Sequence, residues 1–446
     1  MMPAREAALL TLTAMERQGA WSNGQLQKVL RERQMEQRDA ALATRLCLGV
    51  LQNQMLLDYY LQHYAAMKLE RMERKVRLNL RIGLYQMLFL TKIPSSAAVS
   101  RAVALTRKHC KNPRAPGMVN GILRTLSRQL DHLPDLPRDS TAGYLSLLHS
   151  HPKWFVEEMG QRLPDRELED LLRWDNGEPP VTVQVNTCRA TAEETTAALE
   201  AQGVTVTPHP WMPDCLLLSG TGDLSRRKAY LDGQFYVQDP AARLTVLAAR
   251  LRPGMRVLDA CAAPGGKSFA AAIDMEDEGE VVACDLHPHK KALIEAGTQR
   301  LGLTSITAQT ADGREFRPEW EGTFDAVLAD VPCSGLGVLQ KKPEIRYKDP
   351  QDWAGLPELQ YDILENVSRY LCPGGVLLYS TCTLRERENE AVTARFLSAH
   401  PEFHREGFPL PGPMGEVTAG EATLWPQRLG TDGFYLCKLQ KEGSLL

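Results

Sequence analysis

Five short runs of apolar and β-branched residues alternate with helical segments from about Arg252 to the end of the chain. This alternation restricts the fold more than any other feature of the sequence. Parallel strands need crossover connections, so strands that alternate with helices predict a doubly wound α/β domain with a parallel sheet. The predicted strands are 256–259, 280–285, 305–311, 324–330 and 376–380.

The first predicted strand leads directly into a turn of small residues. It reads Asp259-Ala260-Cys261-Ala262-Ala263-Pro264-Gly265-Gly266-Lys267-Ser268. A strand, a tight turn and a helix start form a ligand cradle. A phosphate loop G-x-x-x-x-G-K-[ST] would need glycine at position 261, and the NAD fingerprint G-x-G-x-x-G is absent. S-adenosylmethionine remains as a candidate, since it has no phosphate and needs a close backbone and acidic partners.

Acidic residues stand at the ends of the next two predicted strands. Asp285 follows Gly266 by 19 residues, the spacing at which an acid reaches a ribose hydroxyl. Asp312 ends the third strand, where a carboxylate would meet the adenine amino group. Either acid alone is also explained as a helix cap. The turn and both acids together favour the S-adenosylmethionine site.

Two cysteines follow two further strand ends. The fourth strand ends in Asp330-Val331-Pro332-Cys333-Ser334-Gly335, and the fifth ends in Ser380-Thr381-Cys382-Thr383. Ligands of open α/β sheets bind outside the carboxyl ends of the strands, so both thiols are expected at the ligand crevice. The alternatives are a redox pair and two ordinary core residues.

A thiol has a specific use in methyl transfer to cytosine C5, which is a poor nucleophile. Addition of a thiolate to C6 makes C5 enamine-like, and C5 then attacks the sulfonium methyl. A carboxylic acid such as Asp330 would assist by protonating or hydrogen-bonding N3. A base then removes the C5 proton, and the thiol leaves. Methylation of an amine needs no thiol.

The N-terminal part is predicted to be helical. The expected helices cover 4–15, 40–61 with Asp39 as a cap, 80–90, 99–109 and 118–130. A proline-containing linker follows, and strands at 181–185 and 215–218 with a capping box Thr191-x-x-Glu194 predict a small α/β module. The predicted domains are 1–139, 140–251 and 252–446.

Charge is distributed unevenly between these regions. Residues 1–139 contain 22 Lys+Arg and 11 Asp+Glu, a balance of +11, whereas the remainder carries −14. Arg71, Arg74, Lys75 and Arg77 concentrate four cations. A basic region on an acidic body indicates attraction to a polyanion, although a solvated basic face also explains it.

Other features narrow the class of protein. We find no apolar run of membrane-spanning length and no signal peptide, so we expect a cytoplasmic protein without a membrane partner. The ten cysteines show no C-x-x-C spacing, which predicts neither a zinc site nor a disulfide framework. We expect a monomer that holds no metal.

Three of these motifs resemble the Nol1/Nop2/Sun family of RNA cytosine-C5 methyltransferases. They are Cys261–Lys267, Asp330–Gly335 and Thr381–Thr383. Further segments resemble a fused NusB-like RNA-binding domain, namely Asp39–Ala43, Lys92–Pro94 and Gly117–Arg124. The segments His151–Phe155, Gln184–Thr187 and Gln238–Ala241 resemble the middle part of such proteins.

The resemblance implies a multidomain protein and a role for each site residue. A NusB-like helical RNA-binding domain would precede a small α/β RNA-binding or linking module and a Rossmann-like methyltransferase domain. Cys382 would be the nucleophile, and Cys333 would assist product release. The substrate implied is 16S rRNA, with tRNA, 23S rRNA or a non-catalytic RNA-binding or antitermination role as alternatives. The residues that would line the S-adenosylmethionine and base pocket are Cys261, Ala262, Ala263, Pro264, Gly265, Gly266, Lys267, Asp285, Asp312 and Asp330.

Overall fold

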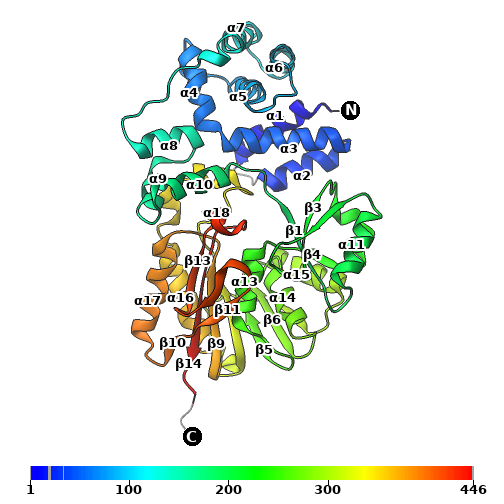
Figure 1. Cartoon of the computed structure of the whole chain (residues 1–446), viewed down its shortest axis with the longest axis vertical. Helices are drawn as coiled ribbons and strands as arrows, with labels where there is room; N and C mark the ends of the chain where they lie inside the picture. Colours follow the sequence, from blue (N-terminus) through cyan, green and yellow to red (C-terminus); the bar gives the residue numbers. More distant parts are fainter. Residues whose placement is uncertain (1, 19–21, 34, 444–446) are drawn as a thin grey trace. The chain divides into compact units, whose positions relative to one another are not determined.

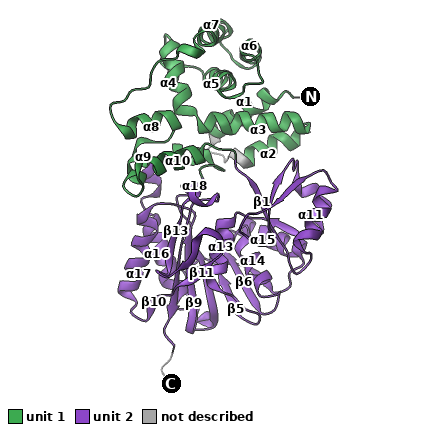
Figure 2. Cartoon of the chain, in the orientation of Figure 1, with its two compact units in different colours: residues 1–178, 339–348 green, residues 179–338, 349–446 purple. Residues whose placement is uncertain are grey.

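The computed structural model describes residues 2–18, 22–33 and 35–443, and the chain forms two compact units. Unit 1 comprises residues 1–178 and 339–348, and unit 2 comprises residues 179–338 and 349–446 (Figure 2). The division of the chain into three domains stays a prediction.

Unit 1 is helical, as the apolar periodicity of the sequence predicts. Its main core is a cluster of buried apolar side chains, mostly leucine, valine and alanine, from α1–α7, and a smaller cluster of Ala4, Ala7, Val29 and Ala43 joins α1, α2 and α3. The helices are α1 (Ala4–Gln18), α2 (Ser22–Glu32), α3 (Gln37–Gln52), α4 (Gln54–Tyr64), α5 (Arg74–Phe89), α6 (Ser95–His109), α7 (Ala115–Arg128), α8 (Thr141–His149), α9 (Lys153–Gly160) and α10 (Asp165–Asp175).

Several helix boundaries in unit 1 differ from the prediction. The helix predicted over 40–61 is two helices, α3 and α4, which meet at Asn53, and α2 was not among the predicted helices. Asp39 lies within the first turn of α3 and Glu36 is the residue that precedes the helix. An acid in the first turn still interacts favourably with the helix dipole, which explains the signal at Asp39. Helix α5 begins at Arg74 rather than at Leu80, so most of the basic run is helical.

Unit 1 also includes the segment 339–348, which follows the predicted Cys333 motif in the chain. Arg346 in this segment is buried, with 1% of its surface exposed. Its guanidinium donates to the carbonyl oxygens of Gln52 and Ser150, both at 3.2 Å, and to Asn176 Oδ1 at 2.8 Å. These acceptors lie at the ends of α3, α8 and α10, where carbonyl groups lack partners within the helix. The sequence contained no signal that this segment belongs with the helices.

Unit 2 contains a small four-stranded sheet in the order β2-β3-β1-β4. Val183, Val185, Leu216 and Phe235 pack beneath it. The predicted capping box is confirmed, because Thr191 and Glu194 exchange hydrogen bonds of 2.9 and 3.2 Å. The elements are β1 (Val181–Val185), α11 (Ala192–Glu200), β2 (Thr205–Pro208), β3 (Cys215–Ser219), α12 (Lys228–Leu231) and β4 (Phe235–Val237).

The large sheet of unit 2 has the order β10-β14-β9-β8-β5-β6-β7, with β13 paired to β14. The five predicted strands are parallel, which confirms the Rossmann-like fold. The strands β10, β13 and β14 are antiparallel additions that were not predicted. The strands are β5 (Arg256–Asp259), β6 (Glu280–Asp285), β7 (Ile306–Thr310), β8 (Phe324–Asp330), β9 (Leu371–Thr381), β10 (Phe403–Arg405), β13 (Glu421–Leu424) and β14 (Phe434–Lys441).

Helices cover both faces of the large sheet (Figure 1). One face packs on α13–α15 and the other on α16 and α17. The carboxyl ends of the parallel strands therefore remain as the edge at which a ligand can approach. The remaining elements are α13 (Pro240–Ala249), α14 (Gly266–Asp274), α15 (Pro288–Leu301), α16 (Leu356–Ser368), α17 (Glu390–Ala399), β11 (Phe408–Leu410), β12 (Gly415–Val417) and α18 (Pro426–Leu429).

Candidate active site

The turn between β5 and α14 has a shape that requires its glycines. Gly265 has φ of 110°, and a Cβ atom there would lie 2.4 Å from the Phe269 ring. A Cβ atom on Gly266 would lie 3.1 Å from Gln238 Nε2. The N–H of Ala262 donates to the Cys284 carbonyl at 2.7 Å, which ties the turn to β6. Helix α14 thus begins beside an open strand end, which fits the cradle predicted for S-adenosylmethionine.

Cys261 lies in this turn, in an environment that disfavours ionisation of its thiol. Burial and the neighbouring carboxylates raise the pKa of its thiol well above the ordinary value. A thiol that keeps its proton is a poor nucleophile. This environment argues against a catalytic role for Cys261, and its place in the cradle, alongside Ala263 and Pro264, stays a prediction.

The two predicted acids follow neighbouring strands. Asp285 ends β6, is 6% exposed and accepts a hydrogen bond from the N–H of His287 at 3.1 Å. Asp312 lies two residues beyond β7, and Arg314 holds its carboxylate with contacts of 2.6 and 3.0 Å. Hydrogen bonding from Arg314 lowers the pKa of Asp312. A hydroxyl or amino group of the cofactor could donate a hydrogen bond to the ionised carboxylate of Asp312.

Asp259 is a further acid at a strand end that we did not predict as a site residue. Its side chain is fully buried, and burial raises its pKa to about 7. Ser268 donates to Oδ2 at 2.7 Å, and a backbone hydrogen bond from Cys261 also reaches the carboxyl group. The carboxyl group thus ties the end of β5 to the turn and to the start of α14, beside the cradle. Its place at the end of β5 was the signal that would have identified it.

Lys267 does not point into the turn but towards Asp330 at the end of β8. Its Nζ lies 2.7 Å from Asp330 Oδ2, and the hydroxyl of Ser380 donates to Oδ1 at 2.8 Å. The ammonium also lies 4.9 Å from the centre of the Phe434 ring. Asp330 is thereby held between β8, β9 and the cradle.

The two predicted cysteines lie together. Their sulfur atoms are 3.2 Å apart, and both side chains are partly exposed. The hydrogen bond to Cys382, together with burial, raises the pKa of Cys333 well above its ordinary value. Cys333 therefore keeps a proton that it can share with Cys382.

Two glycines hold the cysteine loops close together. The N–H of Gly337 donates to the Cys382 carbonyl at 2.9 Å, and the N–H of Gly433 donates to the Gly337 carbonyl at 2.7 Å. A Cβ atom on Gly337 would lie 1.9 Å from the Gly433 oxygen. The C-terminal segment before β14 thus packs directly on the Cys333 loop, a contact that the sequence did not reveal.

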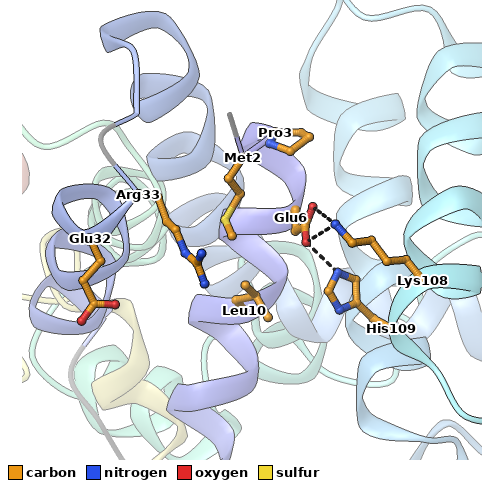
Figure 3. Close-up of a pocket in the computed structure, with 8 residues that line it drawn as sticks. All are labelled: Met2, Pro3, Glu6, Leu10, Glu32, Arg33, Lys108 and His109. Carbon is orange, nitrogen blue, oxygen red and sulfur yellow. Dashed lines mark hydrogen bonds and ion pairs between the residues drawn. The ribbon is translucent and has the colours of Figure 1, made fainter.

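A cavity of about 920 Å³ lies elsewhere, in unit 1. Figure 3 shows Glu6 facing Lys108 and His109, with ion pairs of 2.8 and 2.9 Å. None of the predicted site residues lines this cavity, and its buried acid is paired. Its lining residues are Met2, Pro3, Glu6, Leu10, Glu32, Arg33, Lys108 and His109.

Two features are absent from the part of the chain that the structure describes. Within it, no helix is long and apolar enough to cross a bilayer. Nor does it contain a group of three or more His, Cys, Asp or Glu side chains arranged to hold a metal ion.

Models of three protein families match the chain. One, described as 16S rRNA methyltransferase RsmB/F, matches residues 246–440, and the NusB family matches residues 2–128. A ferredoxin-like domain of RsmF/B-like methyltransferases matches residues 151–225. The order of the predicted helical, small α/β and methyltransferase parts agrees with these matches.

Relatives match over nearly the whole length. A probable ribosomal RNA small subunit methyltransferase B of Bacillus subtilis (strain 168) is 35% identical, over 98% of this chain and 99% of that protein. The ribosomal RNA small subunit methyltransferase B of Vibrio cholerae is 32% identical over 92% of each chain. A crystal structure described as PH0851 covers 99% of both chains with a TM-score of 0.83 and 26% identity. This chain therefore belongs to the RsmB/F family of S-adenosylmethionine-dependent rRNA methyltransferases.

Proposed function

We propose that this protein methylates C5 of a cytosine in 16S rRNA, with Cys382 as the covalent nucleophile. The observation that carries the proposal is the pair of thiols, 3.2 Å apart, at the strand ends next to Asp330. Transfer to an amine or a hydroxyl group would leave both thiols without a use. The names of the Bacillus and Vibrio relatives support the small-subunit RNA as substrate. An enzyme of rRNA is expected in the cytoplasm.

In the proposed reaction, the Cys382 thiolate forms a bond to C6 of the cytosine. S-adenosylmethionine supplies the methyl group to C5 when it is bound in the cradle. The C5 proton then leaves to a base, the C5–C6 double bond forms again, and the Cys382 sulfur departs as a thiolate. Cys333 assists at this last step, because its S–H donates a hydrogen bond to the departing sulfur.

Asp330 is proposed to serve N3 of the cytosine. Addition at C6 increases the negative charge on N3, and a proton donor there stabilises the transition state. Lys267 lies 2.7 Å from the Asp330 carboxylate and is a source of that proton.

The RNA is proposed to bind helices α5–α7 of unit 1. Residues 74–130 contain twelve Lys+Arg and no Asp or Glu. Part of this charge is used internally, since Arg74, Arg77 and Arg81 pair with Glu16 at 3.0–3.2 Å. Seven exposed cations have no ion pair with any described residue, and these are Lys92, Arg101, Arg107, Lys111, Arg114, Arg124 and Arg128. They replace the run at 71–77 as the leading candidates for phosphate contacts.

The experiment that tests the function maps 5-methylcytosine in 16S rRNA, 23S rRNA and tRNA incubated with the protein and S-adenosylmethionine. We expect a single modified cytosine in 16S rRNA, and no product with Cys382→Ala. Cys333→Ala should form a protein–RNA adduct that survives a denaturing gel. Modification of tRNA alone would refute the substrate, and turnover by Cys382→Ala would refute the nucleophile.

A further inference from the structure

Asn389 brackets the proposed nucleophile on both sides. It is fully buried and lies immediately before α17. Its Oδ1 accepts a hydrogen bond from the Thr381 hydroxyl at 2.5 Å, and its Nδ2 donates to the Thr383 carbonyl at 3.0 Å. The residues before and after Cys382 are therefore both attached to one amide side chain.

Glu388, the preceding residue, brackets the other thiol in the same manner. Its carboxylate Oε2 accepts hydrogen bonds from the N–H of Ser334 at 2.9 Å and from the Gln360 amide at 3.1 Å. The same Gln360 nitrogen donates to the Pro332 carbonyl at 2.9 Å. The residues before and after Cys333 are thus attached to Glu388, directly or through Gln360.

The two brackets form one rigid unit. Glu388 and Asn389 are consecutive, and the hydroxyl of Tyr379 donates to the Glu388 carbonyl at 2.5 Å. The two loops also meet through the hydroxyl groups of Ser334 and Thr383, which are 2.8 Å apart. The brackets thus connect the two cysteine loops to each other and to the end of β9.

Stability alone does not explain this arrangement. Glu388 is fully buried and faces the equally buried Arg385, whose Nη1 lies 3.8 Å from its Oε1; a buried carboxylate is costly unless hydrogen bonds and charges compensate. Apolar residues of similar size often stabilise a core as well or better. The side-chain hydrogen bonds described for Glu388 and Asn389 go to the neighbours of the two cysteines and not to a sulfur atom, so we assign neither as a reacting group. Both side chains instead determine the positions of the two cysteine loops.

We propose that Glu388 and Asn389 are positioning residues that hold the two thiols in register, Asn389 for Cys382 and Glu388 for Cys333. The inference rests on the proposed covalent mechanism. It assigns different steps to two adjacent residues: Asn389 supports formation of the Cys382 adduct, and Glu388 supports its release. A purely structural role would instead slow both steps together.

Two isosteric variants separate these roles. Glu388→Gln removes the charge that strengthens the hydrogen bond from Ser334, and Asn389→Asp removes the donor to the Thr383 carbonyl. Glu386→Gln is the matched control, because Glu386 is exposed two residues away and undergoes the same chemical change. RNA that contains 5-fluorocytidine measures adduct formation alone. In this RNA a C–F bond replaces the C5–H bond from which the base must remove a proton, so the adduct cannot be released. Ordinary RNA measures complete turnover.

With Glu388→Gln we expect adduct formation near the wild-type rate and turnover lowered about tenfold or more, with adduct accumulating on ordinary RNA. With Asn389→Asp we expect adduct formation slowed by a similar factor and no accumulation. Glu386→Gln should behave as wild type in both assays.

The proposal would be overturned if both variants slowed both steps equally. It would also be overturned if the variants had lower melting temperatures but an unchanged ratio of adduct formation to turnover. If Glu388→Gln alone does not fold, the Asn389→Asp result decides, since normal adduct formation in that variant contradicts the assignment. A wild-type protein that forms product but no adduct with 5-fluorocytidine RNA would refute the covalent mechanism and this inference with it. A wild-type adduct with unchanged variants would refute this inference alone.

Discussion

The cations of α6 and α7 that lack ion partners lead to a quantitative prediction for RNA binding. Replacement of Arg101, Arg107, Arg114 and Arg124 by glutamine should weaken RNA binding and lower its dependence on salt. All four side chains are exposed, and none has an ion pair with a residue in the described ranges. Their removal should therefore leave the helices intact, because no buried partner loses its counterion.

The magnitude follows from the release of counterions. Each phosphate contact contributes about 0.7–0.9 to the slope of log K against log salt. Loss of four contacts should reduce the slope by roughly 3. At 0.15 M salt this corresponds to roughly a 10²–10³-fold weaker complex, if the contribution vanishes at 1 M. S-adenosylmethionine binding should not change, because its cradle lies in unit 2.

The assay is titration of a 16S rRNA fragment at several salt concentrations. The control is Arg173→Gln with Arg395→Gln, since both arginines are exposed but pair with acids at 2.7–2.9 Å. Substitution is a sharper test than deletion of residues 1–139, which would cut through unit 1. An unchanged slope in the fourfold variant would show that RNA binds elsewhere, and an equal fall in the control would show that net charge alone matters.

Three further changes test the site itself. Asp330→Asn should lower the rate of adduct formation by about 10²–10⁴-fold with RNA affinity unchanged, and a near-normal rate would mean that Asp330 serves only to hold Lys267. Asp259 has a folded-state pKa raised to about 7, so its ionisation costs stability as the pH rises from about 4 to about 7, by roughly 4 kcal/mol in total. The melting temperature of Asp259→Asn should thus rise relative to that of the wild type between pH 5 and pH 8. A difference in melting temperature that does not change with pH would contradict the raised pKa of Asp259. Gly337→Ala places a Cβ atom 1.9 Å from the Gly433 oxygen, so methyl transfer should fall while S-adenosylmethionine still binds; full activity would show that this contact can relax.

The parallel part of the large sheet could be predicted closely from the sequence. The bounds of β5, β6 and β8 are those predicted, at 256–259, 280–285 and 324–330. Strands buried on both faces are short apolar runs, and each of these three ends at an aspartate that faces the open edge. The local sequence therefore predicts each strand and the residue at which it ends, and so it also predicts the positions of Asp285 and Asp330.

The antiparallel strands and the support of the cysteine loops could not be predicted in this way. Strand β14 pairs with β9 only after the chain returns from α17 and α18, and this pairing has no local pattern. The same holds for Glu388, which lies 54 residues from its partner Ser334. The pairing of Arg77 with Glu16 makes Arg77 a weaker candidate for an RNA contact than its sequence neighbours indicate. This pairing could not be predicted because Glu16 lies 61 residues earlier. In each case the deciding contact is distant in sequence.

The ranking of the two thiols illustrates what the structure adds to such a sequence. Two sulfur atoms 3.2 Å apart cannot both be ionised at moderate cost, so their titrations are coupled. The hydrogen bond to Cys382 and burial raise the pKa of Cys333, so Cys333 keeps its proton, which supports the proposed assignment of Cys382 as the nucleophile. In the proposed mechanism, the Cys333 S–H donates a hydrogen bond to the Cys382 sulfur when that sulfur leaves as a thiolate. The two residues of the same type would thus have different roles, which depend on the environments that the brackets of Glu388 and Asn389 maintain.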